Sequence, residues 1–283
     1  MRLDESQREI LLRVGVFVVV FLTMAVLEVL APRRPSTASK ARRWSTNLAI
    51  VGLGIITVRL LAVIAQPLVA IGAAVLAETR GIGLLHLVGW PVWLEIALAV
   101  IVLDFAIWLQ HVASHRIPLL WRLHRMHHAD VDIDVTTALR FHPLEIGLSM
   151  LYKVAWVFLL GPSALAVMLF EVVLNGCAMF NHANVALPDW LDRMLRTLAV
   201  TPDMHRIHHS VIEREHHSNF GFNLSIWDRV FGTYTAEPTN GHAGMRIGLP
   251  VYQSDAPTRL GWSLWLPFSS TPPKREAHSS IDP

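Results

Sequence analysis

Histidine is the residue type in this chain whose spacing most clearly indicates chemistry. Twelve of the fifteen histidines lie between residues 111 and 217. Side chains three or four residues apart share one face of a helix, so a cluster with this spacing can direct two or three imidazoles toward a common point. Eight histidines form three such clusters: His111 and His115; His124, His127 and His128; and His205, His208 and His209.

Converging imidazoles predict a metal centre, because neutral imidazole is the commonest protein ligand for transition metals. The second cluster reads HRMHH, and the same spacing recurs as HRIHH in the third. Zinc is normally satisfied by four ligands, so eight histidines favour two metal ions. Ligand type alone does not choose among zinc, copper, iron and nickel, since imidazole suits all of them.

Asp104 stands seven residues before His111, two helical turns earlier on the same face. A carboxylate inside an apolar span is costly unless it is paired, so a functional role is the default reading. We expect Asp104 to accept the free N–H of a ligating histidine and thereby to fix its tautomer. The alternative is an ion pair with Arg116 or Arg122.

Four further histidines are placed by their neighbours in the sequence. His182 follows an apolar segment at the level of the clusters, and we expect it to be a ninth ligand. His142 precedes Pro143, which suits the start of a helix, so it either caps that helix or lies near the metals. His216 and His217 follow the third cluster and lie either near the metals or at the surface.

The composition indicates a membrane protein. The chain is 53% hydrophobic and 16% charged, with a mean hydropathy of +0.42, whereas soluble domains carry about 25% charged residues. The single cysteine, Cys177, excludes an internal disulfide and an iron–sulfur cluster held by this chain alone. The net charge of +2 is small, and five of the 24 lysine and arginine residues are concentrated in one short loop, which favours membrane orientation over nucleic-acid binding.

The apolar segments predict an all-α, polytopic membrane bundle, since a spanning helix needs about 20 apolar residues. Residues 10–31 are predicted to be a retained membrane anchor. Residues 48–77 are predicted to form one long span that kinks or tilts at Pro67, and residues 90–110 a span that returns across the membrane. Residues 144–181 read as a hairpin broken at Gly161 and Pro162. The linker 32–45 holds five basic residues and no acid, so it is expected on the cytoplasmic side. This topology brings the three clusters to the same side, as a cytosolic, histidine-lined di-metal cap.

The chain divides into three predicted parts. Residues 1–100 hold the N-terminal transmembrane helices and the linker, and residues 101–240 form the catalytic domain. Residues 250–283 form a tail that is expected to be disordered, because Ser269 to Pro273 lead into a short charged end without material for a core.

Several of these features together resemble the fatty acid hydroxylase/sterol desaturase superfamily of membrane di-iron oxygenases. They are Asp104 with His111 and His115, the two His-x-x-His-His clusters, and four connecting phrases: DVTTALRFHPLE, FNHANV, TPDMHRIHHS and NFGFNLSIWDRVFGTY. The similarity runs from about Leu103 to Tyr234. It implies roughly four membrane helices, two irons, and O₂ as the oxidant of a C–H bond in a fatty acyl chain or sterol. By position it carries over the eight clustered histidines as ligands, with His182 as the ninth.

The leading hypothesis is therefore a lipid hydroxylase or desaturase, and the sequence does not choose between the two reactions. Iron is favoured for O₂ chemistry on a lipid because zinc has no redox chemistry. The electrons would come from a separate donor, a small cytochrome or ferredoxin with its reductase, since the chain shows no cluster or nucleotide fingerprint. The alternatives are a metal-ion transporter, which would hold its ligands near the bilayer midplane, and a zinc hydrolase, whose His-Glu-x-x-His motif is absent from the sequence.

Overall fold

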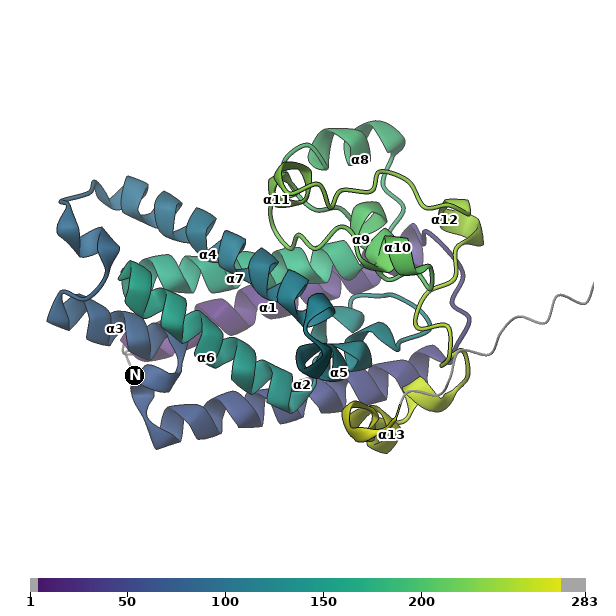
Figure 1. The fold of residues 1–283 in the computed structure, drawn as a ribbon, viewed down its shortest axis with the longest axis horizontal. Coiled ribbons are helices and arrows are strands. Elements are labelled where there is room, and N and C mark those ends of the chain that lie inside the picture. The colour runs from purple at the N-terminus through teal and green to yellow at the C-terminus, as the bar shows by residue number, and fades with distance from the viewer. Residues whose placement is uncertain (1–4, 271–283) are drawn as a thin grey trace, which may run out of the picture.

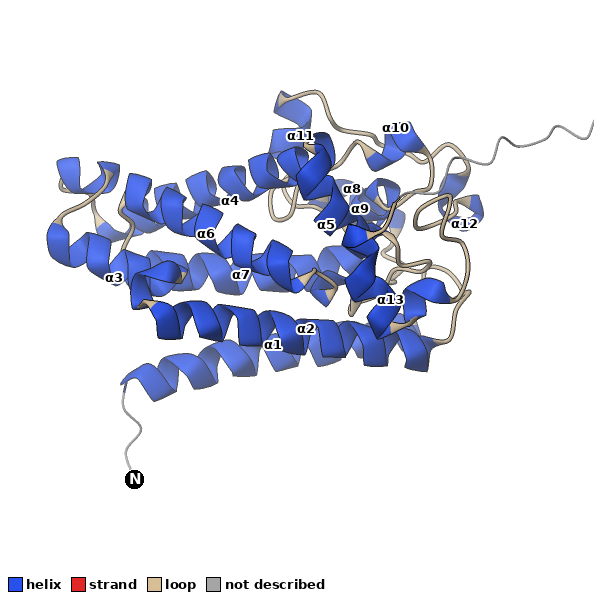
Figure 2. Ribbon diagram, turned by 60° about the horizontal axis from the view of Figure 1, so that its bottom comes forward, coloured by secondary structure: helices blue, strands red, loops and turns tan. Residues whose placement is uncertain are grey.

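The computed structural model describes residues 5–270 as a bundle of long helices that carries a cap of short helices and loops at one end (Figures 1 and 2). Within this range the structure has isolated β-bridges but no strand. The predicted all-α class is confirmed. The longer helices are α1 (Glu5–Leu30), α2 (Lys40–Ile64), α3 (Ala70–Arg80), α4 (Val92–Arg116), α5 (Pro118–His128), α6 (Pro143–Leu160) and α7 (Ala164–His182).

Six segments of the described chain are long and apolar enough to cross a membrane. Helices α1, α2, α4, α6 and α7 run along the bundle, whereas α3 lies at the end opposite the cap (Figure 1). The outward side chains are apolar: Val29 is 70% exposed and Val63 is 83% exposed. Such a surface suits lipid rather than water, because spanning helices satisfy their backbone groups internally and present apolar side chains to the bilayer.

The segment predicted as one long span over residues 48–77 is two helices. Helix α2 ends at Ile64, a short 3₁₀ turn (Gln66–Leu68) contains Pro67, and α3 then begins at Ala70. Proline lacks the N–H that would continue the helix, and the chain changes direction there instead of kinking within one span. Helix α3 packs against α6 and α7. The prediction of a single span was therefore wrong.

The predicted hairpin over residues 144–181 is confirmed as α6 and α7. Gly161 ends α6 in the left-handed conformation (φ 68°), which glycine adopts without steric cost. A Cβ at this position would lie 2.2 Å from the carbonyl oxygen of Ile82. Ser163 then caps α7, and both its backbone N–H and its hydroxyl donate to Glu95 at 2.9 and 3.0 Å. This turn returns the chain to the cap, where α7 ends at His182.

The basic linker between α1 and α2 lies at the cap end of the bundle, as expected. Arg33 pairs with Asp203 at 3.0 Å, and the buried guanidinium of Arg43 pairs with Asp130 at 2.7 Å and Asp134 at 2.5 Å. These cations therefore bind acids of the segments that carry the histidines. The short helices of the cap are α8 (Asp189–Leu195), α9 (Pro202–His208), α10 (Glu213–His216), α11 (Ile226–Val230), α12 (Gly241–Gly244) and α13 (Leu260–Trp265).

The prediction of a disordered tail from residue 250 was wrong as far as the structure describes the tail; residues 271–283 lie outside the described residues. Helix α13 is followed by a 3₁₀ turn (Leu266–Phe268) that packs against α5, and Leu266 is buried with Met126 of α5. Two arginines hold this segment through its backbone carbonyls. Arg125 donates to Leu266 O at 2.5 Å, and Arg140 to Pro257 O at 2.9 Å.

A chain that ends at Leu249 is therefore expected to unfold at a lower temperature than a chain that ends at Ser270. Loss of residues 250–270 exposes the apolar cluster around Met126 and removes the carbonyl acceptors to which Arg125 and Arg140 donate. A buried polar group without a partner costs about 1–3 kcal/mol. Thermal unfolding of the two chains in the same detergent measures the difference, and equal midpoints would contradict the packing described here.

Candidate metal centre

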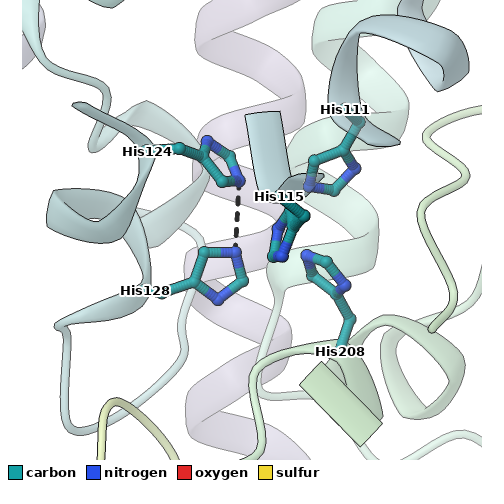
Figure 3. A group of neighbouring side chains, drawn as sticks. All are labelled: His111, His115, His124, His128 and His208. Atoms are coloured by element: carbon teal, nitrogen blue, oxygen red, sulfur yellow. Dashed lines mark hydrogen bonds between the residues drawn. The ribbon is translucent and has the colours of Figure 1, made fainter. Parts of the chain in front are cut away.

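Nine buried histidines lie together in two adjacent groups at the cap end of the bundle. In the first, each ring offers one nitrogen, and these nitrogens all lie within 4.8 Å of one another. Figure 3 shows the five rings surrounding a common space. We call this group the five-histidine site; its members are His111 and His115 of α4, His124 and His128 of α5, and His208 of α9.

The second group meets the same distance criterion with four rings. We call it the four-histidine site; its members are His127 of α5, His182 at the end of α7, His205 of α9, and His209 directly after α9. The two sites are in contact, since the ring centroids of His128 and His209 are 4.5 Å apart. The structure therefore brings together all nine histidines named from the sequence.

Helical spacing explains how each His-x-x-His-His cluster serves both sites. His124 and His128 are four residues apart on α5 and share the face that meets the five-histidine site. His127 lies beside them and contacts the other group, with its Nε2 3.2 Å from Nε2 of His182. In the third cluster the arrangement is reversed: His205 and His209 join the four-histidine site, and His208 joins the five-histidine site. One short helix thus bridges two sites.

Four of the rings have their Nδ1 atoms within hydrogen-bond distance of a fixed oxygen. The distance is 2.7 Å in each case, and the pairs are His111 with Phe220 O, His124 with Glu145 Oε1, His182 with Ala178 O, and His208 with Ser218 O. A carbonyl or carboxylate oxygen only accepts, so Nδ1 carries the proton and donates. The lone pair is then left on Nε2, and the ring is held in the orientation that a metal ligand needs.

The Nε2 atoms fit metal ions by distance and by their lack of other partners. Nε2 of His182 is 3.2 Å from that of His127 and 3.1 Å from that of His205, and His124 and His128 are also 3.2 Å apart. Ligands with bonds of about 2.0–2.1 Å to one metal lie roughly 3 Å from each other. Several ring nitrogens, including Nε2 of His111 and of His208, are buried without a hydrogen-bond partner. Buried polar atoms are normally paired, so these orphans suit metal coordination.

The surroundings favour the neutral form of five of the imidazoles. Burial, followed by repulsion from neighbouring histidines, holds the pKa of five of the rings well below the ordinary histidine value. This applies to His127, His128, His205, His208 and His209. Neutral imidazole is the form that binds metal. Aromatic rings close the sites: Phe141 stacks on His127 at 4.4 Å, and Phe220 lies 5.1 Å from His115.

Asp104 does not contact a histidine among the described residues, so the predicted contact was wrong. Its Oδ2 accepts from Trp227 Nε1 at 2.8 Å and from Leu224 N at 3.3 Å. Seven residues of helix separate it from His111 by about 10 Å, which is too far for their side chains to meet. Asp104 instead holds the segment after Phe220, whose carbonyl oxygen accepts from His111. Neither Arg116 nor Arg122 is bonded to it.

The sequence analysis missed Glu145, the carboxylate that does contact a histidine. Glu145 lies in the first turn of α6, and its Oε1 is 2.7 Å from Nδ1 of His124, 21 residues earlier. No local spacing connects these two residues. The only signal was the position of Glu145 in the phrase DVTTALRFHPLE, directly after the helix start at Pro143.

The remaining histidines take different positions. His142 caps α6, accepting from Leu144 N at 3.2 Å, so the capping interpretation is confirmed. His216 is buried and lies close to the five-histidine site, with its ring 4.5 Å from that of His128 and 4.9 Å from that of His115. His217 is partly exposed. Neither belongs to the two groups.

The similarity of this chain to known proteins covers the part that carries the nine histidines. The fatty acid hydroxylase model matches residues 96–233, a range that contains all nine histidines. This part of the chain is a fatty acid hydroxylase region by its match to the family model. It is 30% identical to an ornithine lipid hydroxylase of Rhizobium tropici over 153 residues, 53% of this chain and 44% of that protein. It is 28% identical to the alkylglycerol monooxygenase of Homo sapiens over 174 residues, 60% of this chain and 37% of the relative.

A cholesterol 25-hydroxylase-like protein of Danio rerio is 25% identical over 146 residues, 50% of this chain and 55% of that protein. The chain therefore spans less than half of the first two relatives. No solved structure matches it. The names of these relatives agree on the oxygenation of lipids. The six candidate spans of the described chain indicate a multi-pass membrane protein.

Proposed function

We propose that this protein is a di-iron lipid hydroxylase that uses O₂ to oxidise a C–H bond near the cap end of the bundle. The observation that carries the proposal is the pair of buried, all-histidine sites in contact with each other. Its support from the comparisons is that the relatives bear the names of hydroxylases and monooxygenases of lipids. Those names favour hydroxylation over desaturation.

The nine histidines would hold the two metal ions, five around one and four around the other. When bound, iron would supply the redox chemistry that O₂ activation requires and that zinc lacks. The four-histidine site has one ligand fewer and so leaves more room for a further ligand. The chain's own contribution is to hold four of the nine rings by an Nδ1 hydrogen bond, through Glu145 and the carbonyls of Phe220, Ala178 and Ser218.

The bundle would present the substrate. Both sites lie where α4 and α7 end and where α5 begins the cap, so a lipid in the bilayer would approach them from the end of the spanning helices. Phe141 and Phe220 line the sites with apolar rings and limit the access of water. This position at the end of the bundle does not favour the transporter alternative, which places its ligands near the midplane.

We place the cap on the cytoplasmic side, because the linker beside it carries five basic residues and no acid. We assign the electrons for each turnover to a separate donor, a small cytochrome or ferredoxin with its reductase. The single Cys177 cannot hold an iron–sulfur cluster by itself.

Purified protein, reduced and kept without oxygen, is expected to contain close to two irons per chain, the number that two adjacent sites hold. After addition of isotopically heavy O₂ with a chemical reductant and membrane lipid extract, mass spectrometry should find one heavy oxygen in a lipid hydroxyl group. An alkene product would correct the reaction to desaturation. Firm zinc occupancy after expression with excess iron, without O₂ consumption, would contradict the proposal.

A further inference from the structure

A small cavity of about 40 Å³ lies outside the metal centre, between the end of α1, the start of α2 and the loop that follows α5. Glu28 comes from the last turn of α1, Lys40 is the first residue of α2, and Asn184 follows α7. A water molecule needs about 10–15 Å³ of such space, so the cavity has room for about three waters or a small polar group.

The cavity contains polar atoms that the protein leaves without hydrogen-bond partners. Two are acceptors, Oε2 of Glu28 and Oδ1 of Asn184, and one is a donor, Nε of Arg34. Glu28 is only 5% exposed. A buried carboxylate oxygen without a hydrogen bond is costly. The nearest cation to it is Lys40, whose Nζ is 3.9 Å from Oε2, too far for a hydrogen bond.

The other charged groups of the cavity are already paired within the protein. Asp132 accepts from Ser36, Thr37 and Ala38, and Arg43 is bonded to Asp130 and Asp134. What remains for an occupant is therefore a site with two acceptors, on Glu28 and Asn184, and two cations, Arg34 and Lys40, with Lys40 Nζ 3.9 Å from Glu28 Oε2. A complementary ligand carries a hydrogen-bonding cation and an anion a few bonds apart.

The height of the cavity in the membrane indicates that this ligand belongs to a lipid. Glu28 lies two residues before the end of one candidate span, and Lys40 begins the next. Lipid headgroups lie at this level of a bilayer. The apolar side chains of Val29 and Leu30, beside the cavity on α1, are 70% and 74% exposed. Acyl chains can therefore cover the helix directly beside the polar site.

We propose that this cavity binds the headgroup of a zwitterionic lipid that carries a primary ammonium group and a phosphate or carboxylate. The ammonium enters the cavity and donates to Glu28 Oε2 and Asn184 Oδ1, and the anion remains at the edge, where it meets Arg34 Nε and the Nζ of Lys40, whose side chain is 45% exposed. A quaternary ammonium does not fit, because it has no N–H to donate.

The cavity is connected to the metal centre through the backbone. Oε1 of Glu28 accepts from Asn184 N at 2.9 Å and from Val135 N at 2.7 Å. Asn184 follows His182 of the four-histidine site by two residues, at most about 7 Å of chain. A lipid held here by its headgroup would lie beside that site. The cavity would thus select the substrate of the proposed hydroxylase, and in this respect the inference rests on the proposed function.

The test is a binding measurement that needs no turnover. Full-length protein in detergent is titrated calorimetrically with three short-chain lipids: phosphatidylethanolamine, phosphatidylcholine and phosphatidylglycerol. We expect phosphatidylethanolamine to bind at least about tenfold more tightly than the other two, because a hydrogen bond to a buried charge contributes that much. Phosphoethanolamine without acyl chains is expected to bind more weakly than the lipid; equal binding would assign the site to a soluble ligand and contradict the lipid proposal.

Two variants separate the halves of the site. Glu28→Gln should remove the preference for phosphatidylethanolamine and leave phosphatidylglycerol binding unchanged. Lys40→Gln should weaken the binding of phosphatidylethanolamine and of phosphatidylglycerol, while the buried hydrogen bonds of Glu28 remain in place. Glu237→Gln, at a side chain 74% exposed in the cap, is the matched control and should change neither. Metal content, measured on every variant, reports whether the fold is retained.

Equal affinity of the wild-type protein for all three lipids would overturn the proposal and leave water as the occupant. An unchanged preference in a metal-loaded Glu28→Gln variant would overturn it as well. If Glu28→Gln fails to fold, the wild-type comparison and Lys40→Gln still decide. Selective binding by a protein that oxidises no lipid would retain the headgroup site and reject the hydroxylase.

Discussion

Replacing His209 by alanine is expected to abolish lipid oxidation and to lower the iron content from close to two to close to one per chain. The four-histidine site would keep three imidazoles, whereas a metal ion normally takes at least four ligands. His208→Ala, one residue away, should also abolish turnover but retain more metal, because four histidines remain in the five-histidine site. Iron analysis and O₂ consumption on the same preparations check both results.

His86→Ala is the control for this pair. His86 is exposed and lies in the 3₁₀ turn Leu84–Leu87, which precedes α4. This turn is at the end of the bundle opposite the cap. It should change neither iron content nor activity. Full iron and near-normal turnover in His209→Ala would reject the four-histidine site. Loss of iron in His86→Ala would place the metal centre at the wrong end of the bundle.

Removing the carboxylate of Glu145 is expected to weaken metal binding and activity by about 10–100-fold, the range typical of residues that orient a metal-ligating histidine. Glu145 holds His124 through its Nδ1. Glu145→Ala removes the acceptor, whereas Glu145→Gln keeps an amide oxygen that can still accept but removes the negative charge. The loss should therefore be larger in the alanine variant. Competition with a chelator measures metal affinity in both.

Asp104→Asn serves as the contrast for Glu145. Asp104 is bonded to Trp227 and Leu224 and not to a histidine, and an asparagine oxygen can accept both bonds. Its effect on metal affinity should be smaller than that of Glu145→Ala. A larger effect for Asp104→Asn would show that the segment after Phe220, and not Glu145, dominates the orientation of the rings.

Much of the metal centre could be predicted from local spacing. Each signal involved residues that are close together in the sequence. These signals were the two His-x-x-His-His clusters, the pair His111 and His115, and the position of His182 after an apolar segment. Helix geometry converts such spacing directly into a shared face. The spans were readable for the same reason, since an apolar run of sufficient length needs no partner to be recognised. The two-helix outcome at Pro67 shows the limit, because a proline marks a break without giving the direction of the next helix.

Only the tertiary structure decided how the nine histidines divide into five and four, because this depends on how α4, α5, α7 and α9 pack. It also replaced Asp104 with Glu145 as the carboxylate partner, a contact across 21 residues with no periodic signal. The C-terminal segment is a third case. The sequence does not reveal the contacts by which Arg125 and Arg140 hold this segment, because their acceptors are its backbone carbonyls. Every residue has a carbonyl, so no residue type marks these positions. Local periodicity thus determined which residues could bind metal, and long-range packing determined which atoms hold them in place.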